Sequence, residues 1–217
     1  MRELRFDRKP ARSGKTTSLV VFLHGYGANG ADLFGLADPL APHLPDTVFL
    51  APDAPEPAQG GYGLQWFPIP WIDGSSEEAA RAGLSRAMID LNGFLDARLS
   101  EEGLTDTALC LLGFSQGAMM AMHVAPRRAV AMAGVVAISG RLLEPEHIGA
   151  TAARPPVLLI HGDDDQVVPF AGMAHAGGVL TAAGFETYAH VMRGTGHGIA
   201  PDGLSVALAF LRDRLPR

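Results

Sequence analysis

The chain has 217 residues, a formal net charge of −6 at pH 7 and a single cysteine. The negative charge argues against a nucleic-acid-binding protein, because no basic cluster is available to neutralise phosphates, and one cysteine excludes an intramolecular disulfide. No apolar stretch approaches the roughly 20 residues that a membrane span needs, and no apolar segment typical of a signal peptide is visible. We therefore expect a cytoplasmic protein without stable membrane insertion, folded as a single domain over residues 1–217.

Short apolar segments alternate with longer amphipathic ones along the chain, which predicts an α/β fold with a mostly parallel central sheet and helices on both faces. The predicted strands lie at residues 19–24, 48–51, 108–113, 134–139, 157–161 and 187–192, with a possible edge strand at 3–7. The predicted helices run from a capping-box sequence at 75–78 to about residue 99, and over 115–124, 170–183 and 201–215. Residues 54–74 form a long aperiodic segment that carries Trp66, Phe67 and Trp71, and such loops are usually functional.

The motif that carries most of the chemistry is Gly113-Phe114-Ser115-Gln116-Gly117, between a predicted strand and a predicted helix. In that context G-x-S-x-G predicts a nucleophile elbow, a strained turn that lifts a serine hydroxyl out of the sheet. The two glycines would let the strand and the helix approach each other without a Cβ clash. The helix that follows also directs N–H groups and its positive dipole end at a developing oxyanion. We predict that Ser115 is a catalytic nucleophile.

A serine hydroxyl is a poor nucleophile without a base, and in this arrangement the serine, the acid and the histidine follow one another along the chain. His197 lies in the glycine-rich segment 194–198, after the last predicted strand, where core packing does not explain a histidine. The acid is one of Asp163, Asp164 and Asp165, which follow a strand at the carboxyl edge of the sheet. The residue pattern alone does not separate these three aspartates.

An oxyanion hole needs two N–H donors near the nucleophile. We expect one from the backbone of Gln116 and the other from the backbone of Tyr26, in the loop 24–30 after an early strand. The same loop also fits G-x-G-x-x-G, with Asp53 after the next strand, and this pattern predicts a dinucleotide site and a nicotinamide-dependent oxidoreductase instead. That alternative leaves the elbow, the acid and the loop histidine unexplained, so we favour a hydrolase and expect no cofactor.

The remaining histidines carry no catalytic pattern. His24 and His161 each end a predicted strand in a His-Gly pair, so we expect them to brace loops through hydrogen bonds. No pair of histidines has metal-ligand spacing with a carboxylate or thiolate nearby, and we therefore predict no metal site.

Together these segments resemble the phospholipase/carboxylesterase family, which includes the acyl-protein thioesterases. The resemblance extends from about residue 19 to the C-terminus and rests on the segments 22–27 (FLHGYG), 113–117 (GFSQG), 161–169 (HGDDDQVVP) and 196–197 (GH). It implies that Asp165 is the acid and that Asp163 and Asp164 shape the loop. It further implies an α/β-hydrolase fold with no large cap domain and an acyl pocket beside Trp66.

The motifs and the resemblance together predict a serine carboxylesterase that hydrolyses carboxylic esters or thioesters of short to medium acyl chains through an acyl-enzyme. Its partner would be a small-molecule ester, and the protein itself a monomer or homodimer. The candidates to line an apolar acyl pocket are Trp66, Phe67, Val168 and Ile199. The alternatives are an acyl-protein thioesterase or a lysophospholipase, an acyltransferase with the same triad, and a non-catalytic binding protein of the same fold.

Overall fold

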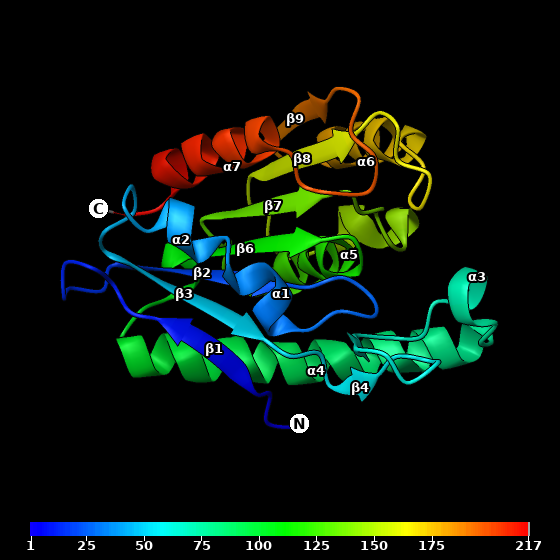
Figure 1. Ribbon diagram of the computed structural model, residues 1–217, viewed down its shortest axis with the longest axis horizontal. Helices are drawn as coiled ribbons and strands as arrows, with labels where there is room; N and C mark the ends of the chain where they lie inside the picture. The colour runs from blue at the N-terminus through cyan, green and yellow to red at the C-terminus, as the bar shows by residue number, and fades with distance from the viewer. Residues whose placement is uncertain (217) are drawn as a thin grey trace.

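The computed structural model describes residues 1–216 and is built around a seven-stranded sheet with the strand order β1-β3-β2-β6-β7-β8-β9 (Figure 1). The strands are β1 (Phe6–Lys9), β2 (Ser18–Leu23), β3 (Thr47–Pro52), β6 (Leu109–Phe114), β7 (Gly134–Ile138), β8 (Val157–Gly162) and β9 (Thr187–Met192). Only β1 runs antiparallel to its neighbour in this sheet. The carboxyl ends of the parallel strands therefore lie at one edge, where sites assemble in open α/β sheets.

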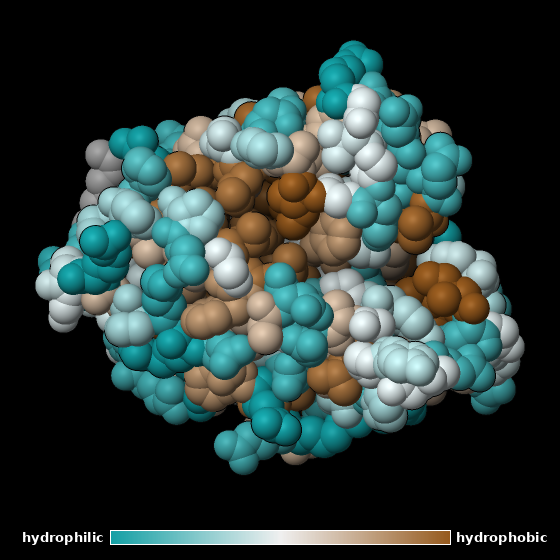
Figure 2. Space-filling model, in the orientation of Figure 1, coloured by the Kyte–Doolittle hydropathy of each residue, from teal (hydrophilic) through white to brown (hydrophobic). Residues whose placement is uncertain are grey.

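Helices cover both faces of the sheet, as predicted. One face is covered by α4 (Glu77–Glu102), α5 (Gln116–Val124) and α6 (Ala171–Ala182), and the other by α1 (Gly30–Phe34), α2 (Ala37–Leu40) and α7 (Pro201–Arg214). Successive side chains of a strand point to opposite faces of the sheet, which divides the core in two. In β2, Leu19 and Val21 pack on the face covered by α4, α5 and α6, whereas Val20 and Phe22 pack on the face covered by α1, α2 and α7. Figure 2 shows apolar side chains gathered between α7 and the pair α1 and α2. Within residues 1–216, no helix combines the length and the apolar character needed to cross a bilayer.

The element boundaries differ from the predicted ones at a few places. β1 begins at Phe6 instead of residue 3, and α4 begins with a simple cap in which Ser76 accepts a hydrogen bond from the N–H of Ala79 at 3.1 Å. The unpredicted elements include the short helices α1, α2 and α3 (Pro70–Asp73), the hairpin of β4 (Glu56–Pro57) and β5 (Leu64–Gln65), and three short 3-10 helices at Asp106–Ala108, Ala125–Arg127 and Pro145–Ala150. These elements are too short to produce a periodic hydrophobic pattern.

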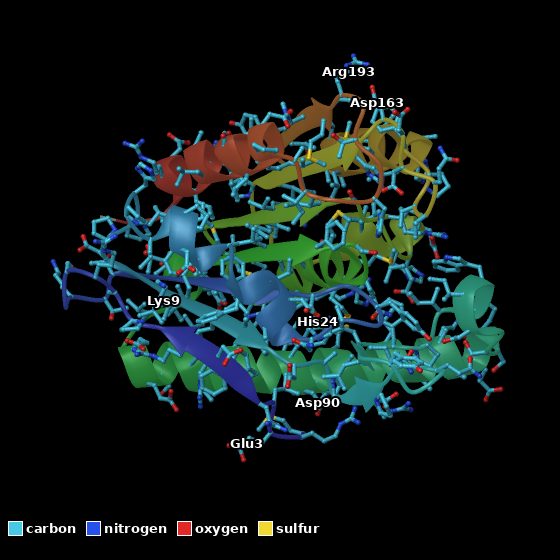
Figure 3. All side chains as sticks on the ribbon, viewed as in Figure 1. Glu3, Lys9, His24, Asp90, Asp163 and Arg193 are labelled. Carbon is cyan, nitrogen blue, oxygen red and sulfur yellow. The ribbon has the colours of Figure 1, made fainter. Side chains whose placement is uncertain are left out.

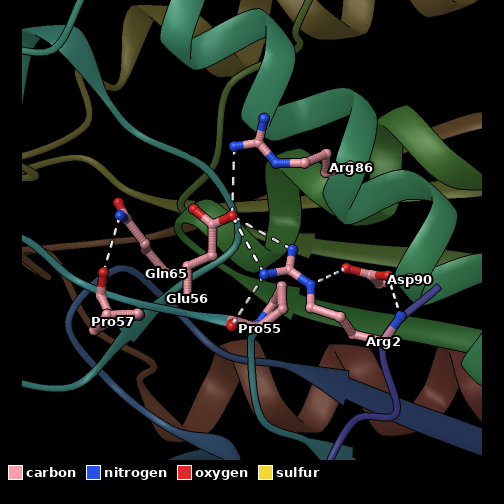
Figure 4. Close-up of polar contacts among 7 residues, drawn as sticks. All are labelled: Arg2, Pro55, Glu56, Pro57, Gln65, Arg86 and Asp90. Carbon is pink, nitrogen blue, oxygen red and sulfur yellow. Dashed lines mark hydrogen bonds and ion pairs between the residues drawn. The ribbon is translucent and has the colours of Figure 1, made fainter.

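The N-terminal residues are tied to α4 through Asp90, a carboxylate that is only 4% exposed. The backbone N and the Nε of Arg2 donate to the two oxygens of Asp90 at 2.6 and 2.7 Å (Figure 4). Guanidinium nitrogens of Arg2 and of Arg86 also approach Oε1 of Glu56, each at 3.4 Å. This network joins the N-terminus, α4 and the β4–β5 hairpin, which belongs to the long segment 54–74.

We expect the substitution Arg2→Ala to lower the free energy of unfolding by about 1–3 kcal/mol, because the buried carboxylate of Asp90 loses its side-chain donor. The control is Lys9→Ala, which removes an ion pair to Asp38, a side chain that is 75% exposed. It should change stability by less than about 1 kcal/mol. Urea unfolding at neutral pH measures both variants, and equal losses would contradict the assigned role of Asp90.

His123 is a second buried polar group, in the last turn of the mostly apolar helix α5. Its Nδ1 makes no hydrogen bond to any part of the chain that the structure describes. Burial, assisted by the nearby guanidinium of Arg127, lowers the pKa of His123 to about 4, from an ordinary value of 6.5. The folded protein therefore holds this imidazole neutral at pH values where the unfolded chain protonates it.

This difference makes stability depend on pH in a defined direction. Above pH 6.5 the contribution of His123 is fully present, and as pH falls towards 4 the unfolded chain binds the extra proton, so stability is lost. The loss is on the order of 3 kcal/mol. Urea unfolding between about pH 7 and pH 4.5 should show a shallower decline for His123→Met than for the unsubstituted protein. The control His175→Met, at an exposed position of α6, should keep the original slope; a parallel decline in His123→Met would contradict this account.

Candidate active site

The structure brings Ser115, His197 and Asp165 into one hydrogen-bonded chain at the carboxyl edge of the sheet. Oγ of Ser115 lies 3.0 Å from Nε2 of His197, and Nδ1 of His197 lies 2.8 Å from Oδ2 of Asp165. The three residues follow β6, β9 and β8, so three parallel strands position them. Ser115 has a φ of 54° and a ψ of −116°, a backbone conformation that is costly for a residue with a Cβ and that occurs at functional turns.

The glycines on either side of Ser115 are required by close backbone contacts. A Cβ at Gly113 would lie 2.3 Å from the backbone of Gly117, and a Cβ at Gly117 would lie 1.8 Å from the carbonyl oxygen of Leu23. Both distances are far below van der Waals contact, so no other residue fits without moving α5 away from β2 and β6. The packing reason predicted for the two glycines is therefore confirmed.

Asp165 is held as a buried carboxylate by several donors. Oδ1 accepts hydrogen bonds from the backbone N–H groups of Val167 and Val168, both at 2.9 Å, and Oδ2 accepts from His197. Burial by itself acts to raise the pKa of Asp165, but the hydrogen bonds from His197, Val168 and Val167 outweigh it and lower the pKa. Because a carboxylate only accepts, Nδ1 of His197 carries a proton and the neutral ring presents Nε2 as an acceptor to Ser115.

The other two aspartates of this loop dock the segment that carries His197. Oδ1 of Asp163 accepts from the N–H of Gly194 at 2.7 Å, and its Oδ2 pairs with Arg193 at 3.1 Å (Figure 3). The hydrogen bond from Gly194 is the main reason that the pKa of Asp163 is lowered. The N–H of Asp164 donates to the carbonyl of Thr195 at 3.0 Å. Both residues thus shape the loop, as the family resemblance implies.

The loop after β2 lies against the serine and is braced by His24. Nε2 of His24 accepts from the N–H of Ala54 at 2.9 Å, so Nδ1 carries the proton and donates to the carbonyl of Gly25 at 2.8 Å. Burial is the main cause that lowers the pKa of His24, which favours this neutral form. A Cβ at Gly25 would lie 3.3 Å from Cβ of Ser115, so this loop and the serine are in contact. The bracing role predicted for His24 is confirmed.

Gln116 has a structural role that the sequence analysis missed. Its side chain is completely buried, with Oε1 accepting from the N–H of Trp66 at 2.9 Å and Nε2 donating to the carbonyl of Phe67 at 2.6 Å. The backbone N–H groups of Gln116 and Tyr26 find no acceptor within residues 1–216. A buried amide at the start of an otherwise apolar helix was the available signal, because such a group needs hydrogen-bond partners.

The side chains predicted to line an acyl pocket do not line one pocket. Trp66 has no exposed surface, and its Nε1 donates to the carbonyl of His24 at 3.0 Å, so its assignment as a pocket-lining residue is wrong. Trp66 instead lies in the core, where it anchors the loop after β2 through His24. Val168 belongs to the core under α4, α5 and α6, whereas Ile199 packs against the core on the opposite face. Phe67 alone of these residues reaches a groove.

That groove has a volume of about 520 Å³ and lies between α3, the start of α4 and the segment after β7. Its apolar lining comes from Phe67, Pro68, Pro70, Trp71, Ala80, Leu84, Leu143 and Pro145, and its polar lining from Glu77, Arg81, Arg141, Glu144, Glu146 and His147. The guanidinium of Arg141 lies 4.7 Å from the ring centre of Trp71. A Cβ at Gly140, the residue before Arg141, would lie 3.2 Å from the carbonyl oxygen of Ser115, so the segment that lines one side of the groove starts close to the serine turn.

The G-x-G-x-x-G pattern has a structural explanation within the chain. Asn29 caps α1 in a reciprocal pair with Asp32, and Oδ1 of Asp53 accepts from the N–H of Gly30 at 2.9 Å. The start of this helix is therefore occupied by the chain's own carboxylates, which would repel a pyrophosphate. A Cβ at Gly30 would lie 2.4 Å from the carbonyl oxygen of Ala51, which accounts for this glycine by packing.

The parallel sheet, the serine elbow and the Ser-Asp-His order define an α/β-hydrolase. The family model described as Phospholipase/Carboxylesterase matches residues 10–215, and the chain belongs to this family. As the resemblance implied, it is a hydrolase.

Named relatives agree with this assignment. Esterase YpfH of Escherichia coli K12 is 27% identical, over 96% of this chain and 86% of that protein. Acyl-protein thioesterase 1 of Eremothecium gossypii is 30% identical, over 96% and 92%. Among solved structures, esterase PE8 is 42% identical with a TM-score of 0.92, covering 98% of this chain and 100% of that one. Acyl-protein thioesterase 2 of Zea mays, 24% identical with a TM-score of 0.77 over 98% and 99%, shares the fold.

The elbow packing leads to a stability prediction. Gly117→Ala should lower the free energy of unfolding by about 3 kcal/mol or more, because the new methyl group must push α5 away from β2. The matched control is Gly178→Ala, at an exposed position of α6 where a Cβ meets nothing within 4 Å. That change should stabilise the protein by about 0.5–1 kcal/mol, since alanine is the better helix former. Urea unfolding tests both, and a neutral Gly117→Ala would contradict the packing argument.

Proposed function

We propose that this protein is a serine esterase that hydrolyses carboxylic esters of short to medium acyl chains, with Ser115 as nucleophile, His197 as base and Asp165 as the acid that orients it. The observation that carries the proposal is the continuous hydrogen-bonded chain from Oγ of Ser115 to Oδ2 of Asp165, at 3.0 and 2.8 Å. The relatives named as esterases support an ester as the substrate.

The proposed reaction proceeds through an acyl-enzyme. Oγ of Ser115 bonds to the carbonyl carbon while Nε2 of His197 takes the hydroxyl proton. As the tetrahedral intermediate collapses, the C–O bond to the leaving alcohol breaks and His197 gives that alcohol its proton. Water then attacks the acyl-enzyme by the same sequence in reverse and releases the carboxylic acid. Asp165 accepts from Nδ1 throughout, which holds the ring in the required tautomer and stabilises the imidazolium.

We assign the oxyanion hole to the backbone N–H groups of Tyr26 and Gln116. Both donors are free of partners within the described chain, and the loop that carries Tyr26 contacts Ser115 through Gly25. The N–H of Gln116 also lies at the start of α5, where the helix dipole favours negative charge. Fixed donors of this kind stabilise the developing oxyanion without reorganisation during the reaction.

The groove between α3 and the segment after β7 is the proposed binding surface for the rest of the substrate. Its volume of about 520 Å³ falls within the range of small-molecule sites, roughly 300–1,000 Å³. Its lining mixes apolar side chains with charged ones, which favours small polar esters and short to medium acyl chains over long ones. A thioester is the second candidate substrate, because acyl-protein thioesterases are among the relatives and the same residues would attack a thioester carbonyl.

Hydrolysis of a p-nitrophenyl ester series from acetate to dodecanoate tests the proposal, with a matched acyl thioester in parallel. Ser115→Ala should lower kcat by on the order of 10⁶ with little loss of stability, because it removes the nucleophile. Ser85→Ala, at an exposed position of α4, is the matched control and should retain full activity. Equal turnover by Ser115→Ala and the unsubstituted protein would contradict the proposed nucleophile. An optimum at the longest chains would contradict the proposed substrate size.

A further inference from the structure

A second histidine lies against the same oxygen of Asp165 that accepts from His197. His161 is the penultimate residue of β8, and its side chain is 1% exposed. Its Nε2 lies 3.0 Å from the carbonyl oxygen of Val168 and 3.1 Å from Oδ2 of Asp165. The ring of Phe170 packs edge-on against it, with the ring centres 6.0 Å apart. His161 is thus enclosed and has no direct route to a substrate.

The neighbours of this nitrogen determine where its proton lies. A backbone carbonyl and a carboxylate both only accept, so Nε2 of His161 carries a proton in either charge state of the ring. The hydrogen bond of this N–H goes to the carbonyl oxygen of Val168, and Oδ2 of Asp165 lies 3.1 Å from the same nitrogen, close enough to share the N–H. The oxygen of Asp165 that it approaches is Oδ2, the same atom that accepts from Nδ1 of His197 at 2.8 Å. The other oxygen, Oδ1, is already occupied by the backbone of the loop.

We propose that His161 is a positioning residue of the triad, which acts through Asp165 by donating Nε2–H to the oxygen that holds His197. The inference rests on the proposed function, because it assigns His161 a part in the same reaction. The carboxylate is fixed from two sides: the N–H groups of Val167 and Val168 hold Oδ1, and His161 holds Oδ2 against rotation.

Loss of this donor should have two consequences. Oδ2 would be oriented by His197 alone, so the base would be aimed less accurately at Ser115 and kcat would fall. The negative charge on Oδ2 would also be shared with fewer donors and would stabilise the imidazolium of His197 more strongly. The ring would then become neutral at a higher pH, which moves the acid limb of the kcat/KM profile upwards. The other charged groups on these loops, Asp164 and the Asp163–Arg193 pair, stay unchanged.

The pair His161→Gln and His161→Met tests the proposal. Glutamine places an N–H donor near the position of Nε2, whereas methionine has a similar length and no donor. With p-nitrophenyl butyrate, His161→Met should lower kcat about 10-fold to 100-fold with KM nearly unchanged, and shift the acid limb upward by about half a pH unit or more. His161→Gln should restore most of kcat and the original profile. His123→Met, which removes a buried histidine outside the triad, is the control and should keep the original profile.

A readout that does not depend on turnover separates this inference from the proposed function. The proton between Nδ1 of His197 and Asp165 should give a downfield ¹H NMR resonance that shifts or broadens in His161→Met and returns in His161→Gln. An unchanged resonance and pH profile in His161→Met, or equal losses in both variants without a shift of the limb, would overturn the positioning role. A shifted resonance in a protein inert towards every ester would sustain the positioning role and contradict the esterase. If His161→Met does not fold, His161→Asn, whose shorter side chain does not reach Oδ2, carries the same expectation.

Discussion

The close approach of α5 to β2 is the constraint on which the rest of the site depends. At Gly117 the helix backbone comes so near the carbonyl of Leu23 that a methyl group has no room. This contact forces the chain to turn sharply between β6 and α5, and Ser115 takes the positive φ that the turn requires. Such a conformation costs on the order of 1–3 kcal/mol and persists only when surrounding packing over-determines it. Here every residue of α5 is buried, so the helix has no alternative position.

The loops around the serine are held to one another by side chains instead of by regular secondary structure. Loops of α/β proteins are usually their most mobile parts, yet each loop here receives a hydrogen bond from a distant residue. Gln116 holds the segment at Trp66 and Phe67, and Trp66 in turn holds His24. Asp163 holds the loop of His197. The geometry of the hydrogen-bonded chain from Ser115 to Asp165 therefore results from cross-links between loops that the strand order places side by side.

The electrostatics of the triad follow from how one carboxylate is solvated by the protein. A buried carboxylate without donors would take up a proton, because burial disfavours its charged form. Asp165 keeps its charge because the N–H groups of Val167 and Val168 and the imidazole of His197 replace the water that burial removed. The same hydrogen bonds distribute the negative charge of Asp165. The carboxylate that accepts from His197 therefore stays ionised, and it attracts the proton on His197 less strongly than a carboxylate without these donors would. A surface carboxylate, with free rotation and full hydration, would provide neither property.

The sequence by itself determined the long strands and helices and the order of the serine, the acid and the histidine along the chain. Apolar runs long enough to be buried on both faces could only be central strands, and G-x-S-x-G between a strand and a helix needs no distant information. The sequence did not separate the roles of the three aspartates, because they are consecutive residues with identical side chains. Only the family resemblance singled out Asp165. The tertiary structure shows the cause, because Asp165 turns inward to the N–H groups of its own loop while Asp163 turns outward to Gly194.

The groove and the role of Trp66 were decided by tertiary structure alone. An aromatic residue in a long aperiodic loop looks the same in sequence whether it lines a pocket or anchors the loop from below. The partners that decide the matter are far apart in the chain: Gln116 lies 50 residues from Trp66. The hydrophobic periodicity of a segment indicates which face of a helix or strand is buried. It does not indicate which side chain of a distant loop will contact that face.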